Sequence, residues 1–303
     1  MSTLNSGRPV VVCCADKNME AGLHVTLYSM LVNLTAKQTG VRLHLFLEGF
    51  SPADVKLLRA TMDAAAVEYE LCLNQISLDK FQGFRSLHGN YMTYARLLLP
   101  GILAGVDRFL YLDSDLVVGT DVAALFQTEM QHRPIAAAGG QTVANALEKP
   151  FFLSIGLPET NPYFNAGVLL FNTIQWRQDN WTQRCLEFCQ KYPDELKAAD
   201  QTVLNALLGR EYLPVDPRFN LTLYPDNARL TPEQARNKII HFVGSPKPWD
   251  LLGNQLHKNS PIFRQYFEKT ALAGRWGLHP RSLLRASRLA RSYYKAFKAL
   301  RRP

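Results

Sequence analysis

The first hundred residues alternate between short apolar runs and segments with helical periodicity, and this alternation limits the folds open to the chain. Residues 9–16 (PVVVCCAD) form a continuous, valine-rich run, which is typical of a strand buried on both faces of a parallel sheet. Apolar residues then recur at spacings of three and four over residues 20–38, which predicts a helix. Residues 41–50 and 67–73 read as two further strands. The pattern predicts an α/β fold whose sheet carries helices on both faces.

Acidic residues stand where two of the predicted strands end. Asp16 ends the first run, and Asp113 follows the apolar run at residues 108–112. In open α/β sheets, ligands bind at the carboxyl ends of strands, so both positions lie where a site is expected. No G-x-G-x-x-G motif follows the first strand, which argues against a dinucleotide-binding dehydrogenase.

Asp113 and Asp115 are separated by a single residue in the stretch RFLYLDSDLVV. Successive side chains on an extended backbone point to opposite faces, so these two carboxylates point the same way. Two like charges at one location are unfavourable unless a cation lies between them or both reach open water. The pair alone therefore allows two interpretations, a divalent metal site or a solvated strand end.

The alternation continues in the second half of the chain. Residues 164–172 (FNAGVLLFN) and 238–244 (KIIHFVG) read as strands, whereas residues 173–192 and 198–208 read as helices. The sequence contains no linker, low-complexity tract or internal repeat. We therefore predict a single main domain over residues 1–268, followed by a distinct tail at residues 269–303.

Composition and charge exclude several classes of protein. No window approaches the roughly 18 apolar residues of a membrane span, and no charged leader precedes an apolar region, so we expect a cytoplasmic protein. The five cysteines are odd in number and lie in apolar segments, which favours free thiols. The net charge of +8 is concentrated in residues 275–303, which contain nine Lys and Arg and no acidic residue. Because the rest of the chain is close to neutral, we expect no nucleic-acid partner.

Four motifs, YLDSD, FNAGVLLFN, ADQTVLNALL and HFVGSPKPW, occur in this order and resemble family 8 of the retaining glycosyltransferases. This group contains bacterial lipopolysaccharide galactosyl- and glucosyltransferases and glycogenin. The resemblance extends over about residues 9–250 and implies a GT-A type single domain with a Rossmann-like mixed sheet flanked by helices. It also implies a metal-dependent retaining hexosyltransferase that takes galactose or glucose from a UDP-sugar.

The resemblance implies that Asp113, Asp115 and His241 hold the metal ion. Two carboxylates, one imidazole and the diphosphate oxygens make a mixed ligand set that suits Mn²⁺, with Mg²⁺ as an alternative. A cation is needed there because the leaving nucleoside diphosphate carries concentrated negative charge. Without the other motifs, His241 would be interpreted as a buried core histidine, since Ile240 and Phe242 flank it.

The resemblance also assigns donor contacts. The donor-binding positions are Asp16, Asn18, His88, Arg96, Ser114, Asn165, Ala166, Gly244 and Lys247. Among them, Asp16 and Asn18 suit the base and the ribose, whereas Gly244 and Lys247 suit the diphosphate. Ordinary explanations stay open as well, such as turn formation for Asp16 and Asn18 or a solvated side chain for Lys247. Arg96 could likewise be a helix-surface charge paired with a neighbour.

Asp200 and Gln201 match the residues near the anomeric carbon in the family. Retention requires either a covalent intermediate or attack from the face that the leaving group vacates. Gln201 is a feeble nucleophile, so we expect front-face attack, with Gln201 steadying the developing positive charge and Asp200 holding sugar hydroxyls. Both could instead be polar residues favoured in the first turn of a helix. Gln141 stands where many family members have an aspartate that contacts the donor sugar, so the hexose is not assigned.

Residues 283–300 have the pattern of a basic amphipathic helix, in which apolar residues recur at spacings of three and four with Lys and Arg between them. Such a helix binds the surface of an anionic membrane. It would hold the protein peripherally at the inner face of the cytoplasmic membrane, beside a lipid-linked acceptor. Alternatively, the helix docks on the main domain with its charges in water.

Three functions are consistent with these features. The first is transfer of a hexose from UDP to a saccharide, such as lipopolysaccharide core or another envelope glycolipid. The second is a glycogenin-like self-glucosylating primer, against which the basic tail argues. The third is a membrane-surface binding module whose nucleotide site is catalytically dead, against which the intact Asp113, Asp115, His241 and Lys247 argue.

Overall fold

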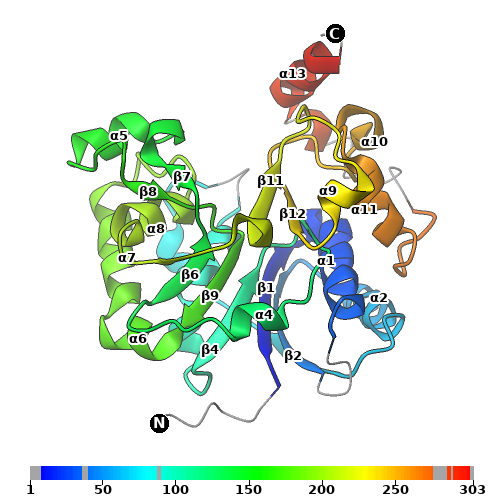
Figure 1. Ribbon diagram of the computed structural model, residues 1–303, viewed down its shortest axis with the longest axis horizontal. Coiled ribbons are helices and arrows are strands. Elements are labelled where there is room, and N and C mark those ends of the chain that lie inside the picture. Colours follow the sequence, from blue (N-terminus) through cyan, green and yellow to red (C-terminus); the bar gives the residue numbers. More distant parts are fainter. Residues whose placement is uncertain (1–7, 36–39, 87–89, 276–284, 288, 301–303) are drawn as a thin grey trace.

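A mixed seven-stranded sheet forms the centre of the protein (Figure 1). The computed structural model describes residues 8–35, 40–86, 90–275, 285–287 and 289–300. In spatial order the sheet contains β10 (Leu213–Val215), β6 (Ile135–Ala138), β9 (Val168–Asn172), β4 (Arg108–Leu112), β1 (Val10–Asp16), β2 (Val41–Glu48) and β3 (Tyr69–Asn74). Neighbouring strands are parallel, except that β9 runs antiparallel to both β4 and β6. The predicted α/β fold with a mixed sheet is confirmed.

Strand β1 explains why its sequence is apolar at every position. Val11 and Cys13 pack on one face of the sheet with Leu23 and Leu27 of helix α1 (Glu20–Val32). Val12 and its neighbours at alternate positions pack on the opposite face, in a second cluster. Successive strand residues point to opposite faces, so in a strand covered on both sides every side chain faces a buried layer and apolar residues are favoured at each position.

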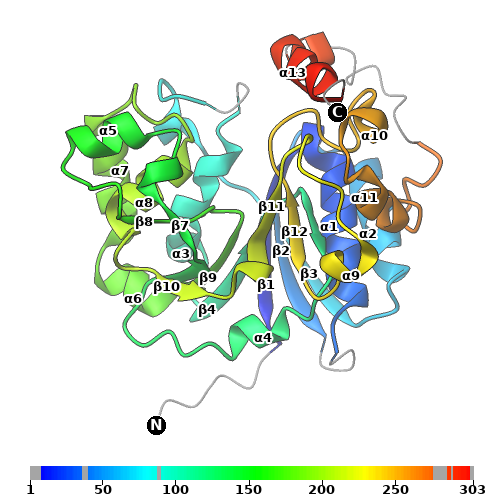
Figure 2. The ribbon, with the colours of Figure 1, turned by 45° about the horizontal axis from the view of Figure 1, so that its top comes forward.

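Helices cover both faces of the sheet, in two groups that lie on opposite sides of β1 (Figures 1 and 2). One group includes α1, α2 (Pro52–Asp63) and α11 (Ser260–Phe267), and the other includes α6 (Thr173–Gln178), α7 (Trp181–Lys191) and α8 (Asp200–Leu208). Further α-helices in the described part of the chain include α3 (Leu99–Ile102), α4 (Ala123–Phe126), α5 (Lys149–Ser154), α9 (Pro232–Ala235), α10 (Gly253–Leu256) and α13 (Ala290–Leu300). Short 3₁₀-helices are η1 (Lys17–Met19), η2 (Asp79–Phe81), η3 (Met92–Leu97), η4 (Val143–Asn145) and η5 (Pro217–Asn220).

Two predicted elements differ from the structure. The helix predicted for residues 173–192 is divided into α6 and α7, because Asn180 adopts a left-handed conformation with φ of 54°. The strand predicted for residues 164–172 is shorter, since β9 begins only at Val168. The preceding four residues form a loop that enters the site described below.

A small second sheet brings the acidic motif next to a distant strand. It contains β11 (Leu221–Leu223), β12 (Ile239–Phe242) and β5 (Leu116–Val118). Strand β4 belongs to the large sheet and β5 to the small one, so the chain passes from one sheet to the other at residues 113–115. Strand β12 runs antiparallel to β5, and His241 pairs with Leu116. A further short pair is formed by β7 (Gln141–Thr142) and β8 (Pro162–Tyr163).

The C-terminal helix α13 packs beside α10 at one end of the molecule (Figures 1 and 2). Leu289, Tyr293 and Ala296 are buried against Leu256. The predicted apolar stripe therefore does not form one free face, because Tyr293 points into the protein while Phe297 is 46% exposed. Two other members of the stripe, Leu283 and the side chain of Leu300, lie outside the described residues.

Two further findings concern the cysteines and the length of the helices. All five cysteines are free thiols, and four of them are buried. Within the described ranges, no helix is both long enough and apolar enough to cross a membrane.

Candidate functional site

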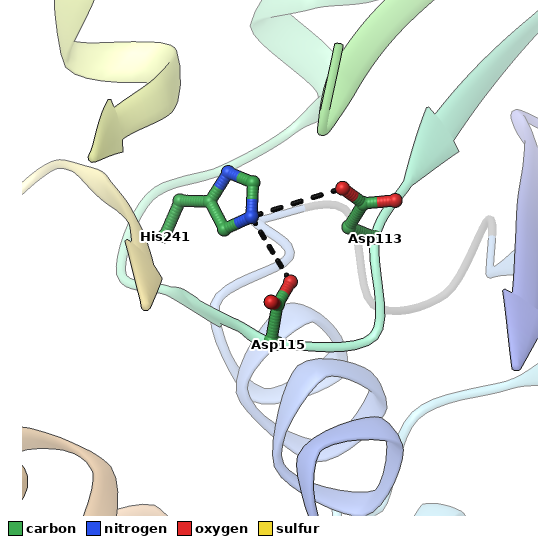
Figure 3. Close-up of side chains that lie close together, drawn as sticks. All are labelled: Asp113, Asp115 and His241. Atoms are coloured by element: carbon green, nitrogen blue, oxygen red, sulfur yellow. Dashed lines mark ion pairs between the residues drawn. The ribbon is translucent and has the colours of Figure 1, made fainter. Parts of the chain in front are cut away.

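Asp113, Asp115 and His241 converge at the crossing between the two sheets (Figure 3). The His241 Nε2 atom lies 3.0 Å from Asp115 Oδ1 and 3.7 Å from Asp113 Oδ2. One potential ligand atom from each residue lies within 4.8 Å of the other two. Asp115 and His241 are buried, whereas Asp113 is partly exposed, so the cluster is open on one side. This arrangement offers hard oxygen and imidazole ligands to a divalent cation.

Gly167 makes room for this cluster. A Cβ atom at this position would lie 2.3 Å from His241 Cε1 and 2.9 Å from Asp113 Oδ2. Its backbone also contributes, because the Gly167 carbonyl accepts a hydrogen bond of 2.8 Å from the Asp113 amide. The glycine of the FNAG stretch therefore allows the backbone of one segment to approach the side chains of two others.

Arg96 lies inside the protein between two carboxylates. Its Nη2 is 2.8 Å from Asp113 Oδ1 and its Nε is 2.8 Å from Asp200 Oδ2. The guanidinium also donates to the Ala166 carbonyl and stacks over the Tyr111 ring, 4.4 Å from its centroid. Only 4% of Arg96 is exposed, so in the structure it organises carboxylates, and its contact with the donor stays a prediction.

Asp200 has an unusual electrostatic environment. Only 2% of the residue is exposed. Burial is the largest influence and raises the pKa of Asp200 to about 7, although Arg96 opposes the rise and Asp113 adds to it. A carboxyl group with a raised pKa next to an ionised neighbour is a common feature of functional sites.

Lys247 is buried beside Asp115. Its Nζ lies 2.6 Å from Asp115 Oδ2 and also donates to the Phe242 carbonyl. Burial disfavours the charged form of Asp115, but Lys247 and His241 outweigh burial, so the pKa of Asp115 lies below its ordinary value. Gly244, in the same loop, has φ of 72°, which favours glycine over any other residue. The loop thus places the ammonium group of Lys247 and the left-handed backbone of Gly244 at the edge of the cluster.

Asp16 and Asn18 form the turn after β1. The Asp16 carboxylate accepts hydrogen bonds from the Asn18 amide at 2.9 Å and from its side chain at 3.2 Å. It also accepts a hydrogen bond of 2.6 Å from Asn90 Nδ2. Asn90 and Glu48 in turn line a polar cleft of about 660 Å³ at the ends of β2 and β3. His88, the other predicted donor residue nearby, lies outside the described residues.

Gln201 is joined to the loop that precedes β9. Its Oε1 accepts hydrogen bonds of 3.0 Å from both Asn165 Nδ2 and the Ala166 amide. Its Nε2 donates to the Tyr163 hydroxyl at 2.6 Å. The structure therefore brings Gln201, Asn165 and Ala166 together, and Asp200 and Arg96 connect them to Asp113. Ser114, between the two aspartates, is 5% exposed.

Comparison with known proteins gives a family match that covers these residues. Residues 10–253 match the family described as Glycosyl transferase family 8. The chain belongs to this family. As a family 8 glycosyltransferase, it uses a nucleotide-sugar donor and a saccharide acceptor.

Individual relatives agree with this membership. General stress protein A of Bacillus subtilis is 26% identical over 273 residues, which cover 85% of this chain and 91% of that protein. Lipopolysaccharide 1,3-galactosyltransferase of Salmonella typhimurium is 26% identical over 247 residues, with coverages of 78% and 72%. The crystal structure of galactosyltransferase LgtC with donor and acceptor sugar analogues matches with a TM-score of 0.69 and 26% identity, covering 89% of this chain and 97% of that one. The GT-A type fold expected from the sequence is therefore confirmed.

Sequence reasoning missed several residues of this family 8 site. Asn90 holds Asp16, Asn220 contacts both Asn165 and His241, and Tyr163 holds Gln201. None of them stands at a strand end next to an acidic motif. Asn220 did appear in an Asn-x-Thr triplet, but that signal concerns glycosylation and carries no information on a metal site.

Proposed function

We propose that this glycosyltransferase moves a hexose, galactose or glucose, from a UDP-sugar to a saccharide of lipopolysaccharide core or another envelope glycolipid. Transfer proceeds with retention at the anomeric carbon and depends on a divalent metal ion, Mn²⁺ in preference to Mg²⁺. The observation that carries the proposal is the convergence of Asp113, Asp115 and His241 beside the buried Lys247. The name of the Salmonella relative supports the class of acceptor.

The three residues fit a divalent cation. Asp115 Oδ1 is buried and receives no hydrogen bond from the described residues, although burial of an unpaired carboxylate oxygen is costly. The His241 Nε2 atom lies 3.0 Å from it, and Gly167 leaves space for the approach. A divalent ion bound there would neutralise the charge that gathers on the diphosphate as the sugar is transferred.

The donor would lie across the carboxyl ends of β1 and β4. Asp16 and Asn18 supply a carboxylate and an amide for the base and ribose, and both are at least partly exposed. Lys247 would bind the diphosphate with its ammonium group, and Gly244 would bind it with its backbone amide. To bind the diphosphate, the Lys247 ammonium group would have to interact with a phosphate oxygen as well as with Asp115, its partner in the structure.

The hydrogen bonds of Gln201 and Asp200 support front-face attack. Both lone pairs of Gln201 Oε1 are used by hydrogen bonds, which makes this oxygen an even poorer nucleophile. Asp200 is 2% exposed and paired with Arg96, so its carboxylate has little access to a sugar carbon. Without an accessible nucleophile, the acceptor would attack from the side of the leaving diphosphate, whose oxygen takes the acceptor proton.

The C-terminal helix would hold the enzyme at an anionic membrane surface. Tyr294 is 70% exposed and Phe297 is 46% exposed, and Arg291, Lys295 and Lys298 are exposed on the same helix. Aromatic and basic side chains together suit the headgroup region of a membrane that contains anionic lipids. This location would place the catalytic cluster close to a glycolipid acceptor.

The proposal is tested with purified protein, UDP-galactose, UDP-glucose and a core oligosaccharide, each with Mn²⁺, Mg²⁺ or a chelator. We expect UDP release and a new product with one of the two donors, and loss of both with the chelator. NMR of the product gives the configuration at the new linkage, which should be that of the donor. Activity that persists in the chelator, or a product of inverted configuration, contradicts the proposal.

A further inference from the structure

A continuous ladder of side-chain amides connects Gln201 with the metal-site histidine. Gln201 bonds to Asn165, Asn165 bonds to Asn220, and Asn220 bonds to His241. The four residues come from α8, from the loop before β9, from η5 and from β12. An amide has one donating and one accepting end, so each link restricts the orientation of the next.

Backbone groups, whose donor or acceptor character is certain, fix the orientation of each amide. The Ala166 amide donates to Gln201 at 3.0 Å, so the atom of Gln201 that it contacts must be the oxygen. The Gly167 amide donates to Asn165 at 2.9 Å, which identifies the oxygen of Asn165 in the same way. The nitrogen of Asn165 then faces Gln201 Oε1, as donation requires.

The orientation of Asn220 follows from its two contacts with Asn165. One of its terminal atoms lies 3.1 Å from the Asn165 carbonyl and 2.9 Å from Asn165 Oδ1. Both of those atoms are acceptors, so the terminal atom of Asn220 must be the donating nitrogen. The oxygen of Asn220 therefore faces His241 Nδ1, at a distance of 3.0 Å.

An oxygen of an amide can only accept, so His241 Nδ1 must carry a hydrogen. In a neutral imidazole the second nitrogen, Nε2, then has a free lone pair. This nitrogen lies 3.0 Å from Asp115 Oδ1 and 3.7 Å from Asp113 Oδ2, the oxygens of the cluster. A metal ligand needs that lone pair, and a hydrogen on Nε2 would block it.

We propose that Asn220 is a positioning residue, which holds His241 with its hydrogen on Nδ1 and so keeps the lone pair of Nε2 directed at the metal. The inference rests on the proposed function, because it takes the metal to be bound by Asp113, Asp115 and His241. Asn220 is 7% exposed and would not contact the metal itself. Its effect on the metal is exerted through the ring of His241.

The opposite tautomer has a ready acceptor, which is why a positioning residue is needed. If the hydrogen moved to Nε2, a turn of the ring would allow its donation to Asp115 Oδ1, which lies 3.0 Å away and receives no hydrogen bond from the part of the chain that the structure describes. Without Asn220, this hydrogen bond would compensate for the loss at Nδ1. The ring would then turn its donor toward the metal position, and one of three ligands would be lost.

The other end of the ladder is anchored in the interior. Gln201 Nε2 donates to the Tyr163 hydroxyl, and this hydroxyl lies 3.3 Å from a carboxylate oxygen of Glu148. Glu148 is fully buried and also accepts a hydrogen bond of 2.8 Å from the Thr202 hydroxyl. The Tyr163 hydroxyl accepts from Gln201 and donates to Glu148, so the direction of donation along this end agrees with the orientation set by the backbone.

The test compares Asn220→Leu with Asn220→Asp. Long-range ¹H–¹⁵N NMR on metal-free protein at pH about 8.5 shows which nitrogen of His241 carries the hydrogen. We expect a hydrogen on Nδ1 in the wild type and in Asn220→Asp, whose carboxylate still accepts from Nδ1. In Asn220→Leu the hydrogen should lie on Nε2. The affinity for Mn²⁺, measured by calorimetry, should fall about 10–100-fold in Asn220→Leu and by less than about threefold in Asn220→Asp.

Asn259→Leu is the matched control, because Asn259 is also a buried asparagine but bonds to Leu230 and Ala228 instead of the metal cluster. Thermal unfolding of the variants separates loss of stability from loss of metal affinity. A hydrogen that stays on Nδ1 in Asn220→Leu, or equal Mn²⁺ affinity in Asn220→Leu and the wild type, overturns the inference. Absence of Mn²⁺ binding in the wild type would instead overturn the proposed function, and the NMR result would be unaffected by it.

Discussion

Arg285, in the segment before α13, forms an ion pair with Asp250, with its Nε 2.9 Å from Oδ1. The other oxygen of Asp250 accepts a hydrogen bond of 2.7 Å from the Lys247 amide. One carboxylate therefore joins the C-terminal segment to the loop that would bind diphosphate. Asp250 is 3% exposed, so loss of its charged partner would leave a buried charge unpaired.

Replacement of Arg285 should therefore affect donor binding, although the residue is remote from the metal cluster in sequence. In Arg285→Ala we expect the KM for the UDP-sugar to rise about threefold to tenfold, equivalent to about 1 kcal/mol, because the Lys247 loop loses its support. Steady-state kinetics with a soluble acceptor measures this change. Arg291→Ala is the control, since Arg291 is exposed on the adjoining helix α13. Equal KM values for the two variants would show that the ion pair does not act on the loop.

If Asp113 and Asp115 hold the metal as proposed, their replacement should abolish activity and leave the fold intact. Asp113→Asn and Asp115→Asn each exchange a charged oxygen ligand for a neutral amide, which weakens the attraction of a divalent ion. We expect turnover to fall at least about 100-fold in each, together with the affinity for Mn²⁺. Asp107→Asn, at an exposed position just before β4, should keep full activity. Wild-type turnover in Asp113→Asn or Asp115→Asn would exclude the assignment.

Gly167 offers a second test of the same cluster, through geometry and not through charge. In Gly167→Ala the new methyl group would lie 2.6 Å from His241 Nδ1, too close for the histidine to keep its position. We expect the affinity for Mn²⁺ and the turnover to fall together, by about 10-fold or more. Gly101→Ala is the control, because nothing lies within 4 Å of its Cβ position. If calorimetry gives the same affinity for Mn²⁺ in Gly167→Ala and in the wild type, the ligands can move to accommodate the methyl group without weakening metal binding.

The sequence alone predicts the large sheet well, because burial on both faces leaves a direct mark. The apolar run of β1, the aspartate that ends it and the aspartate that follows β4 indicate both the sheet and the edge where ligand binding is expected. No sequence pattern indicates that the chain leaves the large sheet after β4 and enters the small sheet at β5. A change of sheet depends on which distant strand pairs with β5, and that strand, β12, is more than a hundred residues away.

The supporting residues of the site could not be predicted for a related reason. Asn220 and His241 are 21 residues apart, and their contact exists only because β11 and β12 pair in parallel. Asparagine is also common in turns. From the sequence alone, Asn220 is therefore interpreted as a turn residue, and nothing indicates that it contacts His241. The break at Asn180, which divides α6 from α7, was hidden by an apolar pattern that continues through it.

Buried His24 predicts a dependence of stability on pH. It is fully buried, and its Nδ1 lies 2.6 Å from the Thr61 hydroxyl. Burial lowers the pKa of His24 to about 3, and Lys17 adds to the effect. The folded protein therefore keeps this ring neutral, while the unfolded chain protonates it near the ordinary value of about 6.5.

Because the folded protein keeps His24 neutral, its contribution to the free energy of unfolding is largest above pH about 6.5. This contribution decreases as the pH falls from there toward about 3. Over this range, His24 should reduce the free energy of unfolding by up to about 1.4 kcal/mol for each pH unit that the pH falls. Urea unfolding at several pH values between about 7 and 5 measures the slope. His24→Gln, which cannot take up a proton, should show a shallower slope, and His132→Gln removes an exposed imidazole as the control. A slope in His24→Gln as steep as that of the wild type would assign the acid sensitivity to other groups.

The proposed membrane contact of α13 depends on its exposed aromatic residues. Tyr294 and Phe297 lie on the part of the helix that Leu256 does not cover, so they are free to enter a headgroup region. The double substitution Tyr294→Ser and Phe297→Ser should lower binding to vesicles of phosphatidylglycerol and phosphatidylethanolamine about 10–100-fold, since partial burial of each ring among the headgroups contributes only part of the about 1.5–3 kcal/mol of full burial. Co-sedimentation at low and high salt measures the binding, and the part carried by lysine and arginine should persist only at low salt. Leu147→Ser is the matched control, because Leu147 is 71% exposed but lies far from α13 in the sequence, beside α5. If the double variant sediments with vesicles as the wild type does, α13 serves only to pack on α10, with its charges in water.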